Sequence, residues 1–314
     1  MFGALALTVL LFPFLTIGVV ITDLLRGIRS FRYVRIGLFV TNILLIEAAG
    51  ILVASYLWLR AGLGIRIKSA ASVQRHMKAQ YWYTSSLLQA ARTFCGLEIE
   101  IEGLDNARAG NAIVIGRHCS LVDAMLPSSV FGQFGHEIKY ALAAGLRWAP
   151  NLDLYGGRLD NTFIDRTSAR GTDDIERLGA MAGRVSAESV AAIFPEGTFF
   201  TPERREKVLK RIAERRPGDL ARAEALRYLL PPQPAGTLAL LEGAPDADVI
   251  LMGHVGFESL STLVDIRDSV PSTTPVKVRL WRFDRAEVPD DPERQIDWLY
   301  ERWAQLDDWI QLNQ

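Results

Sequence analysis

The sequence predicts an α/β fold, a mostly parallel central sheet covered by helices, preceded by an N-terminal helical membrane hairpin. Two long apolar runs open the chain, and from residue 69 ordinary amphipathic sequence follows, in which short apolar strands alternate with helical stretches. We therefore expect two parts: a membrane-anchoring helical hairpin over residues 1–68 and an α/β domain over residues 69–314.

The first part has the length and composition of membrane-associated helices. Residues 1–22 carry no charge, and as a helix they would extend roughly 33 Å, about the thickness of a bilayer core. Residues 36–59 form a second apolar run, interrupted by Asn42 and Glu47. A cleaved signal peptide is the alternative, but no basic residue precedes the first run and no small-residue cleavage site follows it.

The charge distribution indicates how this hairpin would lie. Residues 1–80 contain nine Lys/Arg against Asp23 and Glu47, whereas the rest of the chain has 26 basic and 34 acidic residues. Two spanning helices would put the basic clusters around residues 26–35 and 60–68 on opposite sides, which the positive-inside rule disfavours. A hairpin embedded in one leaflet keeps both clusters at an anionic lipid surface, so we expect membrane lipids as partners and no nucleic acid.

The second part contains seven predicted strands. They cover residues 97–104, 111–118, 138–143, 161–166, 189–197, 246–257 and 274–283. Helices are expected over residues 71–95, 121–132 and 288–311, the last packing on the domain through its tryptophans. In parallel sheets the loops at the carboxyl ends of strands gather the chemistry, so we look for functional residues there.

Cysteine and histidine usage argues against a disulfide framework and against a metal centre. The chain has two cysteines, Cys95 and Cys119, with no C-x-x-C, and only four histidines. His136 and His254 are not part of an H-E-x-x-H or similar pattern. We predict no metal.

The stretch "GRHCSLVDAML", residues 116–126, follows a predicted strand and contains the candidate chemistry. Cys119 is a poor partner for His118 because the side chains of adjacent residues diverge, and Ser120 lacks the G-x-S-x-G turn that exposes a nucleophilic serine. The remaining interpretation is an imidazole, His118, oriented by the carboxylate of Asp123 and acting as general base on a hydroxyl of the substrate. By itself this spacing is a weak signal.

Other sequence blocks strengthen the interpretation of His118 and Asp123 as a functional pair. "RHCSLVD", "KYALAAGLRWAP" (139–150), "FIDR" (163–166) and "FPEGT" (194–198), in this order, resemble the four-block pattern of glycerolipid acyltransferases, the lysophosphatidic acid acyltransferase family. The segment "FFTPERREKVLKRIAERR" (199–216) is more similar to the eukaryotic-type lysophosphatidate and lysocardiolipin branch. The resemblance implies the glycerolipid acyltransferase fold for the α/β domain.

The resemblance also implies roles for individual residues. His118 matches the catalytic base and Asp123 its orienting partner. The positions that match the acceptor-binding blocks are Arg166, Glu196, Gly197 and Thr198. A guanidinium such as that of Arg166 suits a phosphate monoester because it forms paired, charge-assisted hydrogen bonds.

Two positions depart from the family pattern. Arg117 stands before the histidine where asparagine is usual, and "PPQPAG" (231–236) stands at the fourth block with Gln233 at the place of its arginine. These departures bear on the identity of the acceptor more than on the reaction.

The implied activity is transfer of a fatty acyl group from an acyl thioester to the free hydroxyl of a lysophospholipid. The first candidate for this acceptor is lysophosphatidic acid, which would become phosphatidic acid. No cofactor is expected to be bound, and acyl-CoA or acyl carrier protein would supply the thioester as co-substrate. The expected location is a membrane, the cytoplasmic one in a bacterium, with the catalytic domain facing the cytoplasm. Alternatives are remodelling of another lysolipid such as lysocardiolipin or lysophosphatidylinositol, a hydrolase using Cys119 or Ser120, and a non-catalytic membrane scaffold.

Overall fold

The computed structural model describes residues 17–18, 20–27, 30–120, 122–165, 171–260 and 263–314. The chain divides into two compact units. The first, here the helical unit, comprises Met1–Glu100, Leu146–Leu159 and Ser259–Val276, and the second, the sheet unit, comprises Ile101–Gly145, Asp160–Glu258 and Lys277–Gln314. The division expected at residues 68 and 69 follows sequence character and stays a prediction.

The sheet has seven strands in the order β1-β7-β6-β2-β5-β3-β4. They are β1 (Ile99–Glu102), β2 (Ala112–Gly116), β3 (Glu137–Ala143), β4 (Thr162–Ile164), β5 (Ser189–Ile193), β6 (Asp248–Val255) and β7 (Val276–Phe283). Strand β2 pairs in parallel with both β5 and β6, β3 pairs in parallel with β5 and β4, and β7 runs antiparallel to β6. The predicted mostly parallel sheet is confirmed, and each predicted strand overlaps an observed one.

The register sets which loops meet at the carboxyl edge of the sheet. Ile115 of β2 lies opposite Ile193 of β5, and Gly116 lies opposite Met252 of β6. The segments that follow β2 and β5 therefore leave the sheet side by side, next to the last residues of β6. This brings together parts of the chain that are about 80 and 140 residues apart.

Six α-helices belong to the described part of the sheet unit. They are α4 (Leu126–Gly132), α6 (Gly171–Ala182), α7 (Pro202–Arg215), α8 (Leu220–Ala225), α9 (Pro234–Gly243) and α11 (Pro292–Asn313), and a short 3-10 turn, Asp123–Met125, precedes α4. Helices α6, α9 and α11 cover one face of the sheet and bury apolar side chains such as Ile113, Ile193 and Leu251 against Leu240 and Trp303. α6 and α9 pack so closely that a Cβ on Gly243 would lie 2.1 Å from the carbonyl oxygen of Gly179.

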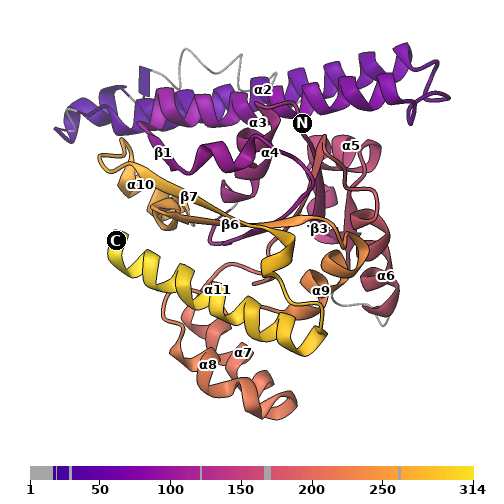
Figure 1. Ribbon diagram of the computed structural model, residues 1–314. Helices are drawn as coiled ribbons and strands as arrows, with labels where there is room; N and C mark the ends of the chain where they lie inside the picture. The colour runs from indigo at the N-terminus through magenta and orange to yellow at the C-terminus, as the bar shows by residue number, and fades with distance from the viewer. Residues whose placement is uncertain (1–16, 19, 28–29, 121, 166–170, 261–262) are drawn as a thin grey trace. The chain divides into compact units, whose positions relative to one another are not determined.

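Helix α11 runs alongside the sheet, in yellow in Figure 1, and packs on β6 and α9. Its tryptophans Trp298, Trp303 and Trp309 are all buried, so the expected packing through them is confirmed. Trp303 is fully buried, and its indole N–H donates to the carbonyl oxygen of Leu230 at 2.9 Å. α11 thus holds the segment before α9 in place.

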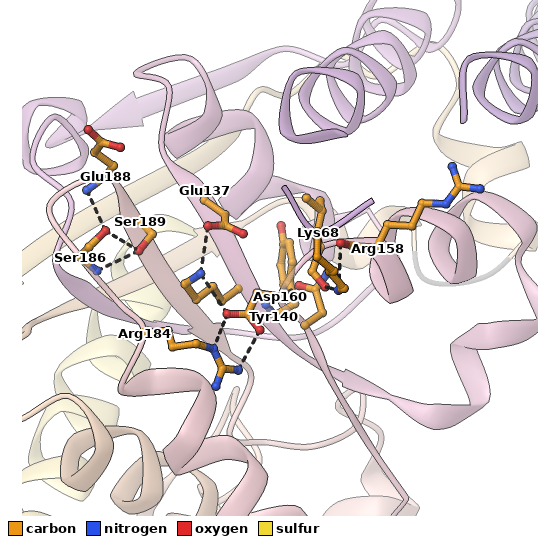
Figure 2. A network of polar contacts seen from close by, with 12 residues as sticks. Lys68, Glu137, Tyr140, Arg158, Asp160, Arg184, Ser186, Glu188 and Ser189 are labelled. Carbon is orange, nitrogen blue, oxygen red and sulfur yellow. Dashed lines mark hydrogen bonds and ion pairs between the residues drawn. The ribbon is translucent and has the colours of Figure 1, made fainter. Parts of the chain in front are cut away.

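A polar network ties together the amino-terminal side of three strands, as Figure 2 shows around Asp160. Arg184, just after α6, forms paired bonds with the Asp160 carboxylate at 2.7 and 2.8 Å. The buried ammonium of Lys139 on β3 lies 3.2 Å from Asp160 and 2.9 Å from Glu137. Ser186 and Ser189 close the turn into β5. The charged network of this edge is self-contained, which fits a structural role.

The helical unit contains α2 (Arg32–Arg60), α3 (Ala70–Cys95), α5 (Pro150–Arg158) and α10 (Leu263–Ser269). α2 and α3 lie side by side (Figure 1), and α5 packs on both. The Glu47 carboxylate accepts hydrogen bonds from Tyr83 on α3 and from Asn151 on α5, the latter at 2.7 Å. The expectation that this carboxyl faces a partner helix agrees with these contacts.

Helix α2 includes the second apolar run, residues 36–59. Within the described residues it is the one helix long and apolar enough to cross a membrane, judged by length and composition alone. The expected first helix of the hairpin falls mostly on residues 1–16, which lie outside the described residues, so the hairpin stays a prediction.

We expect Trp303→Ala to lower the free energy of unfolding by about 3–5 kcal/mol, because it leaves a large cavity and an unpaired carbonyl at Leu230. Urea unfolding of the purified chain measures this. Trp303→Phe, which keeps most of the ring, should cost less, and Trp148→Ala, at an exposed site, should cost almost nothing. Equal stability of all three variants would contradict the role given to Trp303.

Candidate active site

His118 and Asp123 form a close pair just beyond the carboxyl end of β2. His118 Nδ1 lies 2.7 Å from Asp123 Oδ1. The other carboxylate oxygen accepts the backbone N–H groups of Cys119 and Ser120 at 2.6 and 2.7 Å. Burial alone would raise the pKa of Asp123, but hydrogen bonds from His118 and His254 hold it well below its ordinary value. The carboxylate is therefore ionised, and it requires a proton on Nδ1 of His118.

The His118 ring is held by two aromatic side chains from the "FPEGT" region. It stacks on Phe194 with ring centroids 4.7 Å apart, and Phe199 meets it edge-on at 4.5 Å. The side chain keeps 18% of its surface exposed, and among the described residues no hydrogen-bond partner faces Nε2. With a proton on Nδ1, this second nitrogen carries a lone pair that is open to an incoming hydroxyl.

The last residue of β2 must be small for this packing to exist. A Cβ on Gly116 would lie 2.7 Å from a ring carbon of Phe194. Glycine at this position lets the Phe194 ring approach the backbone of β2, where it forms the wall against which His118 stacks. A larger residue at position 116 would therefore displace the Phe194 ring from its contact with His118.

Glu196 has a different set of contacts from those expected. The side chain is buried, with Oε1 accepting the N–H of His118 at 2.8 Å and Oε2 accepting the N–H of Leu230 at 3.0 Å. Burial raises its pKa to about 8, and the two backbone N–H groups and Arg117 oppose that rise. The carboxyl group thus joins the loop after β2 to the segment before α9, and both of its oxygens are bound to backbone N–H groups.

Gly197 and Thr198 continue the same loop. Gly197 adopts φ 75°, in the left-handed region that glycine occupies without strain, and its N–H donates to the carbonyl oxygen of Phe194 at 3.0 Å. Thr198 follows and is half-buried. Arg166 lies outside the described residues, so its expected contact with a phosphate stays a prediction.

Residues 98–231 match the family model described as acyltransferase. This span begins before β1 and ends in the segment before α9, so it contains His118, Asp123, Arg166 and the Glu196 loop. The match covers less than half of the chain. Over this span the predicted resemblance to the acyltransferase family is confirmed.

Two individual proteins are similar to the chain. Mouse 1-acyl-sn-glycerol-3-phosphate acyltransferase epsilon is 23% identical over 235 residues, 70% of this chain, and the match spans 63% of the mouse protein, less than two thirds of its length. The crystal structure of the 1-acyl-sn-glycerophosphate (LPA) acyltransferase PlsC from Thermotoga maritima has a TM-score of 0.51, 15% identity and coverage of 85% of this chain and 95% of that one. The second likeness shows the fold.

Both departures from the family pattern have structural explanations in the sheet unit. Arg117 is buried and spans from β2 to the end of β6, where it donates to the carbonyl oxygen of His254 at 2.6 Å and pairs with Glu258. Gln233 donates through its backbone N–H to Pro195 at 2.9 Å and through its side chain to the carbonyl oxygen of Glu196 at 3.2 Å. Both residues bind protein groups and hold the loops around His118 and Glu196 in place.

Cys119 and Ser120 are almost completely shielded from solvent. Both are buried, the hydroxyl of Ser120 accepts the N–H of Asp123 at 3.3 Å, and burial raises the pKa of the Cys119 thiol. Cys119, Asp123 and His254 offer three potential ligand atoms within 4.8 Å of one another. A neutral thiol and a carboxylate already occupied by N–H groups are poor ligands, so these donors do not suit a metal ion.

Several contacts of the site could not be predicted from the sequence motifs. Phe194, Phe199 and Leu230 act through ring faces or backbone groups, which depend on the fold. His254 is fully buried and lies 3.5 Å from Asp123. Its position at the end of a predicted buried strand was the available signal, because such strand ends line the functional edge of a parallel sheet.

We expect Glu196→Gln to destabilise the domain in a pH-dependent way. Glutamine can accept only one of the two N–H groups, which should cost about 1–3 kcal/mol. Because the folded protein raises the pKa of Glu196 from about 4.5 to about 8, its contribution is fully present at low pH and is lost as pH rises toward 8.

The stability gap between the wild type and Glu196→Gln should therefore narrow between pH 5 and pH 8.5 in urea unfolding. The exposed change Glu301→Gln serves as control and should leave no gap. A gap that stays constant over this range would show that Glu196 remains ionised in the folded protein.

Proposed function

We propose that the chain transfers a fatty acyl group from an acyl thioester to the free hydroxyl of a lysophospholipid, converting lysophosphatidic acid to phosphatidic acid. The observation that carries this proposal is the His118–Asp123 pair, in which Nδ1 is bound at 2.7 Å while Nε2 faces an open side with no protein nucleophile beside it among the described residues. A base arranged in this way acts on a hydroxyl that the substrate supplies.

The chemical steps follow from this arrangement. As the lipid hydroxyl attacks the thioester carbonyl, His118 Nε2 takes its proton, and the new C–O bond forms a tetrahedral oxyanion. The oxyanion collapses, the C–S bond breaks, and the thiolate leaves with the proton that His118 then returns. Asp123 stabilises the doubly protonated ring between these two transfers, as in other His–carboxylate pairs.

The choice of acceptor rests on the relatives and on one residue. Both similar proteins are named for a 1-acylglycerol-3-phosphate acceptor. Arg166 is the candidate for the phosphate, because a guanidinium binds a phosphate monoester through paired hydrogen bonds. Another lysolipid, such as lysocardiolipin or lysophosphatidylinositol, is the second candidate, and the glutamine at position 233 in place of an arginine favours it.

The hydrolase alternative is disfavoured by burial. A nucleophile must reach the acyl carbonyl, whereas Cys119 and Ser120 are at most 5% exposed and their polar groups point into the protein. The scaffold alternative does not explain why the domain assembles a buried carboxylate with an oriented imidazole. We therefore favour acyl transfer over both.

We also propose that membrane lipids are partners and that α2 lies in one leaflet. Exposed apolar side chains along it include Val40, Leu45, Leu52 and Leu59. On another side, the α5 residues Tyr155 and Arg158 donate to carbonyl oxygens in the middle of the same helix, at Gly50 and Ala54. A helix covered on one side by polar contacts and apolar on the other has the form of an interfacial helix.

The activity is tested by incubating the purified chain with labelled acyl-CoA or acyl carrier protein and a panel of lysolipids. We expect the highest kcat/KM with lysophosphatidic acid. His118→Ala should lower turnover by about a hundred- to ten-thousandfold, and Asp123→Asn should lower it strongly because the amide no longer selects the Nδ1–H form. His136→Ala, at a histidine that binds the carbonyl oxygen of Arg108, is the matched control.

The outcomes separate the candidates. A preference for another lysolipid would replace the acceptor but keep the reaction, and Arg166→Gln should then weaken all phosphate-bearing acceptors alike. Full activity in folded His118→Ala would exclude the base mechanism. Absence of product from every acceptor and donor would exclude acyl transfer to lysolipids.

The membrane arrangement is tested with single cysteines at exposed positions: Arg26→Cys before α2, Arg66→Cys after it, and Gln314→Cys in the sheet unit. In sealed inside-out vesicles, whose outer surface is the cytoplasmic face, an impermeant maleimide should label all three cysteines. Both ends of an interfacial helix stay at one membrane surface. Intact cells, which expose the opposite face, should give no labelling. The native Cys95 and Cys119 are buried, so labelling of the unsubstituted chain measures the background. Labelling of Arg26→Cys and Arg66→Cys from opposite sides would show that α2 spans the membrane.

A further inference from the structure

A second histidine faces the carboxylate that orients His118. His254 lies near the end of β6 and is fully buried, and its Nε2 is 3.5 Å from Asp123 Oδ2, at the outer limit of a hydrogen bond. His118 binds the other oxygen, Oδ1, at 2.7 Å. The two imidazoles therefore approach one buried carboxylate on its two different oxygens.

The surroundings of His254 define which of its nitrogens carries the proton. Nε2 faces two acceptors, Asp123 and the carbonyl oxygen of Arg117 at 3.2 Å, so it is the donor. Nδ1 is buried and has no hydrogen-bond partner among the described residues. The ring of Phe257 packs edge-on at 5.2 Å. Among the described residues, only the Nε2 side of this imidazole faces polar groups.

A reciprocal pair of contacts fixes this orientation. The Arg117 guanidinium donates to the backbone carbonyl of His254 at 2.6 Å, while the His254 ring faces the backbone carbonyl of Arg117. The N–H of Arg117 also donates to Met252 on β6 at 3.1 Å. The end of β6 and the residue before His118 are thus locked to one another.

We propose that His254 is a positioning residue for the acyl transfer, whose Nε2–H shares the charge of Asp123 and so limits how strongly that carboxylate stabilises the doubly protonated form of His118. This inference rests on the proposed function of His118 as general base. A base that holds its proton too firmly is already protonated near neutral pH and is unavailable to the hydroxyl.

The direction of the effect follows from charge sharing. Asp123 accepts two backbone N–H groups and the Nδ1–H of His118, and His254 Nε2 lies 3.5 Å from its second oxygen. Each of these N–H groups offsets part of its negative charge. Without His254, more of that charge acts on His118, and the cationic ring gains stability. The acidic limb of the pH–rate profile should then move to higher pH.

Other ionisable groups face this cluster and are the same in every variant to be compared. The buried Arg117 pairs with the partly exposed Glu258 next to His254, Glu196 binds the N–H of His118, and the thiol of Cys119 lies beside Asp123. None of these groups is changed by substitution at position 254. A shift that depends on that position alone is therefore attributable to the His254–Asp123 contact.

Two substitutions separate the Nε2–H from the rest of the side chain. His254→Gln places an amide N–H near the position of Nε2, whereas His254→Leu fills a similar volume without a donor. We expect His254→Leu to raise the midpoint of the acidic limb of kcat/KM by about 0.5–1 pH unit, a roughly three- to tenfold loss of rate below that midpoint and little loss well above it. His254→Gln should resemble the wild type.

A purely structural role would lower the rate by the same factor at every pH and in both variants, and that result would overturn the proposal. Profiles identical to the wild type in both variants would overturn it as well. If His254→Leu does not fold, His254→Asn replaces it, because its shorter amide keeps polarity but does not reach Asp123.

A second measurement does not depend on turnover. Ring ¹⁵N resonances of histidine-labelled protein follow the protonation of His118 directly, and the His118→Ala spectrum assigns them among the four histidines of the chain. The titration of His118 should move to higher pH in His254→Leu and stay in place in His254→Gln. If the wild type transfers no acyl group, the proposed function fails, and this titration still decides whether His254 acts on the His118–Asp123 pair.

Discussion

The buried carboxylate of Asp123 is the interaction on which the site depends. It accepts the Nδ1–H of His118 and the backbone N–H groups of Cys119 and Ser120, so one side chain shapes the loop and sets the proton position of the ring. A buried charge is tolerated only where such donors compensate for lost water. The same compensation keeps the carboxylate ionised, which the proposed chemistry requires.

The fold supplies these donors because three strands end at one place. β2 lies between β5 and β6, so the His118 loop receives Phe194 and Glu196 from one neighbour and His254 from the other. Glu196 continues the connection to Leu230, which Trp303 of α11 holds from the core. Site geometry and core packing are therefore coupled through a short series of hydrogen bonds.

Polar groups serve different purposes at the two edges of this sheet. At the amino-terminal edge, the cations Lys139 and Arg184 pair with the carboxylates of Glu137 and Asp160. At the carboxyl edge, His118 keeps one nitrogen without a partner among the described residues. Unpaired polar groups cost stability, so an unpartnered nitrogen at this position agrees with the proposed contact between His118 and a substrate hydroxyl.

The sequence by itself determined the seven strands, the helix that carries the tryptophans and the His118–Asp123 pair, because these depend on local periodicity and on residues five positions apart. Only the tertiary structure decided that Glu196 turns toward the backbone, that Arg117 and Gln233 brace the loops, and that His254 meets Asp123. Such contacts join residues about 35 to 140 positions apart, and the strand order and register that create them leave no periodic trace in the chain.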